Sequence, residues 1–294
     1  MTPRTEPAGT APEGDAAGPG SARTESAGAA SEGHATGADG ARLFRASDGL
    51  WSPTPVAAGP WAPGRLHGGA VAALMARRAQ DVLGADRPLA RLSTDFLGPL
   101  PALPLRIGVR TVRAGRSFGL VEVRAYADGT EVARASALGV RAADLPLPVP
   151  DAEPALPPRA DGLPVRGVPE DVPSFNRDAV EITAVDDPAN PHGASVWGRL
   201  AVGLTDPGPP PPWAAAVALA DLAYGVGAVL PPDRYRSVNV DLAVHLLRPP
   251  SGDWIGLRAR TRTGPGGRGA AEAVLLDDDG CFGTAAQTLL ISEE

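Results

Sequence analysis

The second half of this chain repeats the order of elements of the first, and this repeat restricts the possible folds more than any other feature. Each half contains an apolar helix, a strand that ends at Pro, a second strand, a glycine turn, a third strand, an Asp-Gly turn and a last strand. The matching positions are Pro99 and Pro249 (an offset of 150), Gly115-Arg116 and Gly267-Arg268 (an offset of 152), and Asp128-Gly129 and Asp279-Gly280 (an offset of 151). Three turns at nearly one offset indicate two copies of one structural unit.

The first copy is predicted to start with a helix over residues 68–83. The sequence His67-Gly68-Gly69 opens this helix, an apolar face follows, and Gly84 ends it. Four strands are predicted at about 90–97, 103–113, 117–127 and 130–141. Their alternating, β-branched residues and the glycine turns between them favour antiparallel hairpins.

The second copy is predicted to contain a strand at about 194–204, a helix at about 213–230, and strands at about 236–247, 254–263, 270–277 and 281–292. An apolar helix and a one-faced sheet must bury against each other. We therefore expect an α+β fold in which each half is an antiparallel sheet curled around a central helix.

Composition predicts where the two units begin and end. Residues 1–41 contain almost no large apolar side chains, and we expect them to be disordered. Residues 42–142 then form the first unit, the Pro-rich residues 143–175 form an extended linker, and residues 176–294 form the second unit.

Charge and cysteine content exclude several functions. The net charge is −7 and every basic residue is Arg, so no basic footprint for nucleic acid is expected. A single Cys281 excludes an intramolecular disulfide and a cysteine-based metal cluster. No apolar run reaches the roughly 18 residues of a membrane helix, and no signal pattern precedes the fold, so we expect a cytoplasmic protein. No cofactor motif or metal-ligand spacing is present.

Asp221 is the most informative candidate residue. It is the only charged side chain between Pro207 and Pro232, inside a predicted helix that is apolar on all sides. Burying an unpaired carboxylate is costly. The side chain therefore either caps amides of the sheet, pairs with a distant Arg, or faces a polar cavity as a catalytic base.

Two polar residues on predicted strands are further candidates. Gln287 lies on the last strand, and its amide can both donate and accept, which suits a residue that orients water. Asn239 lies on the strand at 236–247, where alternation places Val238, Val240, Leu242, Val244 and Leu246 on one face and Asn239 on the other. A solvent-facing position is the alternative for Gln287.

His67, Gly68 and Gly69 stand at the entrance of the first helix. His67 is expected to act as a cap, with the two glycines allowing a close backbone approach. The same helix amides can instead hold an anion or a developing oxyanion. Several arginines near turns can clamp phosphates, and Arg268 is the substrate-binding candidate among them.

These residues resemble a known family. Residues 65–74 and 95–99 resemble the first half of the double-hotdog acyl-CoA thioesterases of type II. Residues 241–254, Gly267-Arg268-Gly269 and residues 284–287 resemble the second half of that family more closely. The resemblance covers about residues 43–292 without the linker, and it implies a tandem hotdog fold.

The resemblance also implies an activity. The family hydrolyses acyl-CoA thioesters with a water held by an Asp on the second-half helix, a Gln on the last strand and a Thr or Ser. Asp221 and Gln287 match the first two, whereas the hydroxyl position falls at Asn239. The first half has Ser136 at the offset from Gln287 and no acid on its helix before Asp81. One active site per chain is therefore expected, with Asp221 as general base and an acyl-CoA or acyl-carrier thioester as substrate.

Two other functions stay open at this stage. A hotdog hydratase or dehydratase needs an acid and a base aimed at adjacent carbons, commonly a His with an Asp or Glu, and the sequence suggests no such close pair. A non-catalytic acyl-CoA-binding or lipid-binding module would keep the fold without turnover, and the Asn239 departure favours it. A homo-oligomer is compatible with either function.

Overall fold

The first half of the chain forms one helix and a set of antiparallel strands, as expected. In the computed structural model, which describes residues 41–60, 62–148, 153–165 and 173–293, helix α1 spans Gly68–Leu83, in agreement with the predicted range. The four strands that follow are also confirmed, namely β3 (Leu89–Phe96), β4 (Leu105–Ala114), β5 (Phe118–Ala127) and β6 (Thr130–Val140). Before α1 lie a short hairpin and a 3₁₀ turn that were not predicted, formed by β1 (Phe44–Ser47), β2 (Leu50–Pro53) and η1 (Pro55–Ala57).

The second half has more elements than the sequence indicated. Its strands are β7 (Leu163–Pro164), β8 (Val180–Val185), β9 (Ala194–Leu200), β10 (Tyr235–Asn239), β11 (Asp241–Leu246), β12 (Ile255–Gly264), β13 (Arg268–Asp277) and β14 (Gly280–Glu293). Its helical segments are η2 (Arg159–Asp161), η3 (Phe175–Ala179), α2 (Pro212–Ala220) and α3 (Ala223–Val226). The elements η2 and β7 lie inside the predicted linker, where the indole Nε1 of Trp197 donates to the carbonyl of Pro157 at 2.9 Å.

The predicted helix over 213–230 is wrong in one respect, because it is interrupted. Helix α2 ends at Ala220, and Asp221 occupies its C-cap with φ −67° and ψ −14°. A new short helix, α3, begins at Ala223. At the break, the backbone N–H of Tyr224 donates to the Gln287 side chain at 2.9 Å. A side chain from the last strand therefore takes the place of a helical partner.

The predicted strand over 236–247 is also interrupted. Asn239 pairs with Leu289, whereas Ala243 pairs with Ala286, so β10–β11 contains one more residue than the facing stretch of β14. This bulge reverses the predicted faces before it. Val238 and Val240 are 44% and 39% exposed, and Asn239 faces inward instead, whereas Leu242 and Val244 are buried as predicted.

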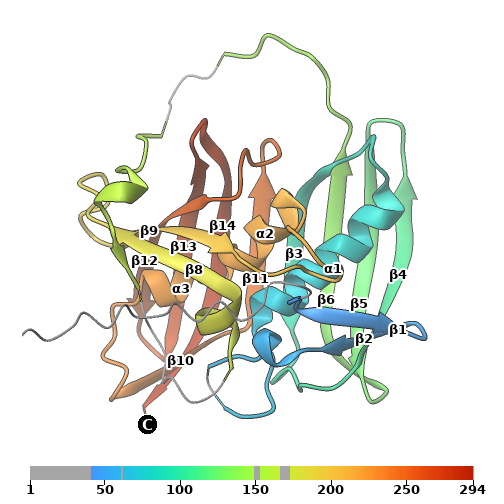
Figure 1. The fold of residues 1–294 in the computed structure, drawn as a ribbon, viewed down its shortest axis with the longest axis horizontal. Helices are drawn as coiled ribbons and strands as arrows, with labels where there is room; N and C mark the ends of the chain where they lie inside the picture. The colour runs from blue at the N-terminus through green and yellow to red at the C-terminus, as the bar shows by residue number, and fades with distance from the viewer. Residues whose placement is uncertain (1–40, 61, 149–152, 166–172, 294) are drawn as a thin grey trace, which may run out of the picture. The chain divides into compact units, whose positions relative to one another are not determined.

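The strands that the structure describes form one antiparallel sheet across both halves, in the order β1-β2-β4-β5-β6-β3-β11-β14-β13-β12-β9-β8-β7, with β10 beside β14. The halves join through β3 and β11, where Asp95 pairs with Asp241 and Thr94 with Leu242. Figure 1 shows α1 lying across the strands of the first half. Helix α2 contacts strands of the second half, and the two helices contact each other.

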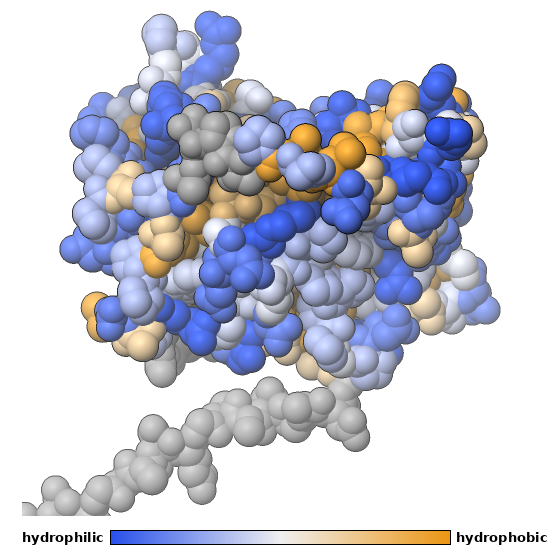
Figure 2. Space-filling model, turned by 90° about the horizontal axis from the view of Figure 1, so that it is seen from above, coloured by the Kyte–Doolittle hydropathy of each residue, from blue (hydrophilic) through white to orange (hydrophobic). Residues whose placement is uncertain are grey.

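A large apolar core lies between the helices and the face of the sheet that they contact. Figure 2 shows one outer face, where hydrophilic side chains dominate and apolar side chains gather in a few groups. None of the helices in the described ranges is both long and apolar enough to cross a membrane. Residues 1–40 of the predicted disordered tail lie outside the described residues, so the domain boundaries stay predictions.

Candidate functional site

The Asp221 carboxylate lies where the end of α2 meets the start of α1. Its side chain is 4% exposed. The backbone N–H of Gly69, in the first turn of α1, donates to its Oδ2 at 2.5 Å. This approach requires glycine, because a Cβ on Gly68 would lie 2.8 Å from Asp221 Oδ2 and one on Gly69 would lie 2.3 Å from the carbonyl oxygen of Ala218. The two glycines thus allow the first half of the chain to reach the acid of the second.

Both other predicted members of the site contact the same carboxylate. Asn239 Nδ2 donates to Asp221 Oδ1 at 2.7 Å, and Gln287 Nε2 donates to that oxygen at 3.0 Å. Gln287 Nε2 also lies 3.0 Å from the Asp221 carbonyl oxygen. Gln287 is therefore buried against the helix break, and the solvent-facing alternative does not apply. The side-chain oxygen of Asn239 has no hydrogen-bond partner within the described part of the chain.

His67 belongs to the same cluster. It is the N-cap of α1, with Nδ1 3.1 Å from the Gly69 nitrogen and 3.2 Å from Asp221 Oδ2. Its ring stacks on Phe175, with the centroids 4.3 Å apart and 21° between the planes. Burial lowers the pKa of His67 from its usual value, against the opposing effect of the Asp221 charge. The expectation that no histidine–acid pair lies close together is therefore wrong.

The two helix ends that meet at the Asp221 carboxylate have opposite electrostatic effects on its negative charge. The start of α1 carries the positive end of the helix dipole and points its amide at Asp221, whereas the end of α2 carries the negative end. Three N–H groups of the protein donate to the carboxylate. An ionised carboxylate offers about four acceptor positions. The remaining position lies on Oδ2, the oxygen that faces His67.

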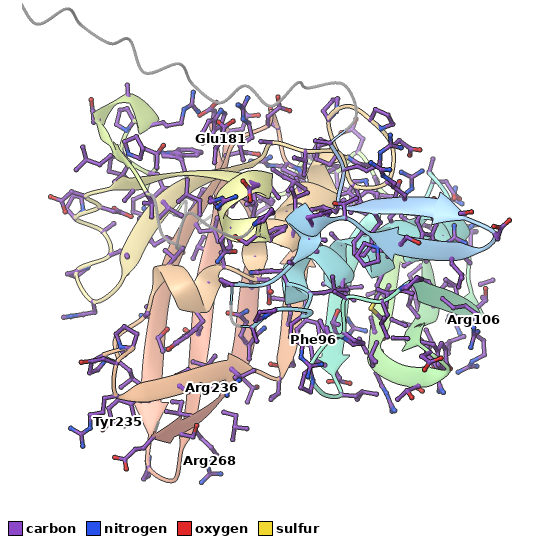
Figure 3. All side chains as sticks on the ribbon, turned by 60° about the horizontal axis from the view of Figure 1, so that its bottom comes forward. Phe96, Arg106, Glu181, Tyr235, Arg236 and Arg268 are labelled. Atoms are coloured by element: carbon purple, nitrogen blue, oxygen red, sulfur yellow. The ribbon has the colours of Figure 1, made fainter. Side chains whose placement is uncertain are left out.

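Arg268 is not brought to this cluster. It is the first residue of β13, where Ala271 and Ala273 are buried, so alternation places Arg268 on the opposite face of the sheet. Figure 3 shows it at the tip of the sheet, whereas Phe96 lies nearer the centre. The Phe96 ring would lie 3.0 Å from a Cβ on Gly68. The site thus contains no arginine from that turn.

The first half has no polar counterpart of Gln287. The last hairpin of each half contains a bulge. In β5–β6 the register shifts between Ala125 and Tyr126, and in β13–β14 it shifts between Leu275 and Leu276. Aligning these bulges gives an offset of 150 and places Ala137, not Ser136, at the position of Gln287. Ala137 is fully buried. Turn residues alone gave an offset that was wrong by one.

Sequence reasoning missed two aromatic residues and one hydroxyl. Phe175 was assigned to the end of the linker, although an aromatic residue in a Pro-rich stretch indicates an anchor on folded structure. Phe96 was included only in the resemblance. Ser237 lies two residues before Asn239 on β10, and its buried Oγ has no partner in the described ranges. The prediction did not single out Ser237, because it treated residues 236–247 as one uninterrupted strand, whereas in the structure the bulge after β10 leaves Ser237 on the buried face.

Comparison with known proteins identifies the family. Residues 57–140 match the N-terminal domain of acyl-CoA thioesterases, and residues 149–291 match their C-terminal domain. A search of curated proteins gives no match.

Solved structures share the fold. An acyl-CoA thioesterase II, TesB2, from Mycobacterium marinum is 19% identical, with a TM-score of 0.63, over 85% of this chain and 94% of that one. A conserved protein with a hot dog fold from Alicyclobacillus acidocaldarius is 20% identical, with a TM-score of 0.65, over 85% and 95%. Because the two thioesterase domains match more than half of the 294 residues, this chain belongs to the acyl-CoA thioesterase family and is a thioester hydrolase.

Proposed function

We propose that this protein hydrolyses an acyl thioester, with coenzyme A as the carrier, by means of a water molecule activated by Asp221. The observation that carries the proposal is a buried carboxylate that receives donors from both halves of the chain, namely from Gly69, Asn239 and Gln287. Such an arrangement fixes the acid in one orientation. It also explains why the chemistry would belong to one site per chain.

The residues present suit the demands of thioester hydrolysis. The reaction needs an activated water and donors for the oxyanion, whereas a thiolate leaves with little assistance, because thiols ionise not far above neutral pH. The free side-chain oxygen of Asn239 can accept a hydrogen bond from water beside Asp221. Gln287 orients the carboxylate. The first-turn amides of α1 that do not donate to Asp221 are the donors that we assign to the oxyanion.

The arrangement of the two halves is consistent with one active site per chain. We infer that the two halves are tandem hotdogs, each an antiparallel sheet curled around its helix, with boundaries near residues 42–142 and 176–294. The pairing of β3 with β11 and the contact between α1 and α2 support this arrangement. Only the second half supplies an acid, so the first half contributes the helix entrance.

Thiol release from a panel of acyl-CoA thioesters of different chain length tests the proposal. Asp221→Asn should lower kcat on the best substrate by roughly 100- to 10,000-fold, the usual contribution of a general base. Asp81→Asn is the matched control, because Asp81 lies on α1 in contact with Arg77 and Arg78 and far from the carboxylate cluster. Full activity of Asp221→Asn, or tight acyl-CoA binding by the wild type without thiol release, would refute the hydrolytic role of this site.

One observation favours a second candidate, hydration or dehydration of an enoyl or hydroxyacyl thioester. His67 Nδ1 lies 3.2 Å from Asp221 Oδ2, which supplies the histidine and acid that such enzymes use. The two groups contact each other, however, and so act as one unit, not as separate groups on adjacent carbons. Following enoyl absorbance beside thiol release on the same substrates distinguishes the two reactions.

Three properties stay predictions from the sequence. These are a cytoplasmic location, a role in lipid metabolism and association into a homo-oligomer. Acyl-carrier thioesters stay an alternative to coenzyme A esters, and the same thiol-release assay with both carriers would separate them.

A further inference from the structure

Two exposed arginines lie on the outer face of the second-half sheet, at the end where β10 and β13 begin and β14 ends. We propose that these residues, Arg236 and Arg268, bind the phosphates of coenzyme A, while its pantetheine arm crosses the edge of β10 to the Asp221 carboxylate. This proposal rests on the proposed hydrolysis and deepens it by naming where the thiol carrier is held. Both arginines lie away from the carboxylate cluster.

The strand register places the two arginine side chains on one face of the sheet. Arg268 pairs with Leu290, and Leu290 pairs with Val238, which lies two residues after Arg236 on β10. Residues two apart on a strand share a face, and adjacent strands are about 4.8 Å apart. The Cα atoms of the two arginines are therefore roughly 12 Å apart, a distance that two long side chains span when they bind one nucleotide. Figure 3 shows both residues at the same end of the sheet.

This end of the face is positive, although the net charge of the chain is −7. Other arginines of the sheet are paired with carboxylates, as Arg262 is with Glu272. Arg236 and Arg268 are exposed, and neither has an ion-pair partner among the described residues. Their neighbours on this face are uncharged, namely Val238, Leu290 and Ser292. Two unpaired guanidinium groups favour an anionic ligand, and their planar shape matches phosphate oxygens.

Exposed apolar side chains lie between the two arginines. Leu290 is 60% exposed, and Val238 beside it is also exposed. Val240 continues this exposed row on the same face, toward the bulge. Adjoining apolar side chains on the surface mark a contact site. The ligand for this face therefore combines anionic groups with an apolar segment.

The arginines and the carboxylate are separated by a single strand at the edge of the sheet. Among the described strands, β10 pairs only with β14. The Val240 N–H donates to the Thr288 carbonyl opposite, so alternation turns the backbone groups of Ser237 and Asn239 toward the other edge. On the inner face, Asn239 Nδ2 lies 2.7 Å from Asp221 Oδ1. A ligand on the outer face reaches the carboxylate by crossing this edge.

The groups of acyl-CoA follow in the same order as these features. The thioester lies at Asp221, and the amides of the pantetheine arm come next, where the backbone N–H and C=O groups at the edge of β10 can bond them as they would an added strand. The apolar dimethyl carbon of the arm then meets Val238 and Leu290. The phosphates lie beyond that carbon, at Arg236 and Arg268.

Thiol carriers of different length, loaded with the same acyl group, test the assignment. These are acyl-CoA, acyl-3′-dephospho-CoA and acyl-pantetheine. Arg236→Gln and Arg268→Gln should each raise KM for acyl-CoA about tenfold, because each removes charge-assisted hydrogen bonds to phosphate, and should leave kcat within about twofold of wild type. KM for acyl-pantetheine, which has no phosphate, should not change. The thermal midpoints should stay near wild type, because both side chains are exposed.

Arg116→Gln is the matched control. Arg116 is exposed in the corresponding turn of the first half, and its replacement should leave KM unchanged for all carriers. Isothermal titration calorimetry with coenzyme A itself gives a readout that does not require turnover. The Kd of the double variant Arg236→Gln/Arg268→Gln should rise roughly 100-fold if the two contributions add. Added salt should weaken binding by the wild type more than binding by the double variant.

Three results would overturn the proposal. The first is a wild type with equal KM for acyl-CoA and acyl-pantetheine, and the second is a double variant with wild-type KM and Kd. The third is a need for both arginines with an acyl carrier protein thioester but not with acyl-CoA, because this face would then dock a protein. Failure of the proposed function is distinguishable, since it appears as a wild type that releases no thiol from any acyl-CoA, whereas calorimetry with coenzyme A still tests the two arginines.

Discussion

Replacing Gly69 by Ala tests whether the site depends on close contact between the two helices. The added Cβ would lie 2.3 Å from the carbonyl oxygen of Ala218 and 2.9 Å from Asp221 Cβ, whereas ordinary contacts begin at 3.4 Å. The ends of α1 and α2 must therefore separate by about 1 Å. This displacement stretches the 2.5 Å bond from the Gly69 amide to Asp221 beyond good hydrogen-bond geometry.

The change in the free energy of unfolding caused by Gly69→Ala has three contributions. Overpacking costs about 1–3 kcal/mol, and losing a hydrogen bond to a charged group costs about 1.5–3 kcal/mol. The better helix propensity of Ala returns about 1 kcal/mol. We expect a net loss of about 1.5–5 kcal/mol in the free energy of unfolding, hence a melting temperature lower by roughly 3–20 °C. Turnover of the folded protein should fall about 100-fold, as for a 1 Å misplacement of reacting groups.

Urea denaturation and thiol release measure both effects. Gly108→Ala is the control, because a Cβ on Gly108 in β4 has no atom within 4 Å. Gly108→Ala should stay within about 1 kcal/mol of wild type. If Gly69→Ala is as stable and as active as Gly108→Ala, the helix ends are not held together as described, and the reasoning about Asp221 fails.

Three further predictions concern the same cluster. Because burial lowers the pKa of His67, the unfolded chain binds a proton there more readily than the fold does, so unfolding free energy should decrease as pH falls below 6.5. His67→Asn should lose this part of the dependence in urea titrations at pH 7.5 and 5, and an unchanged slope would contradict it. Gln287→Ala should cost about 1–3 kcal/mol by chemical denaturation, since it leaves the Tyr224 amide without its acceptor; a cost near zero would mean that water replaces the side chain. Asn239→Asp brings a second carboxylate within 2.7 Å of Asp221, so thiol release should fall at neutral pH and recover partly in acid, and equal activity at both pH values would refute the contact.

Local patterns were enough to predict much of the fold. The range of α1 followed from the glycines at its two ends, and the hairpins of the first half followed from alternation between turn residues. These features depend on neighbours within a few residues. They are therefore readable from one sequence, as was the unusual position of Asp221.

The missing parts depend on contacts between distant segments. The interruption after Asp221 is stabilised by Gln287, and the bulge near Val240 is set by pairing with β14. Neither has a local sequence mark. The pairing of His67 with Asp221 arises only when two helices from different halves meet end to end. The sequence contained both residues but not the information that they touch.

The register of β3 against β11 sets the position of one half of the chain relative to the other. A shift of this pairing by a single residue would displace one half against the other by about 3.3 Å, more than the length of any hydrogen bond that the Asp221 side chain makes across the halves. Insertions in either strand should therefore be far more harmful than insertions in the outer strands, even where no side chain of the cluster is altered. New substrate specificity can therefore evolve through insertions in the outer strands of the sheet, whereas the lengths of β3 and β11 must stay constant.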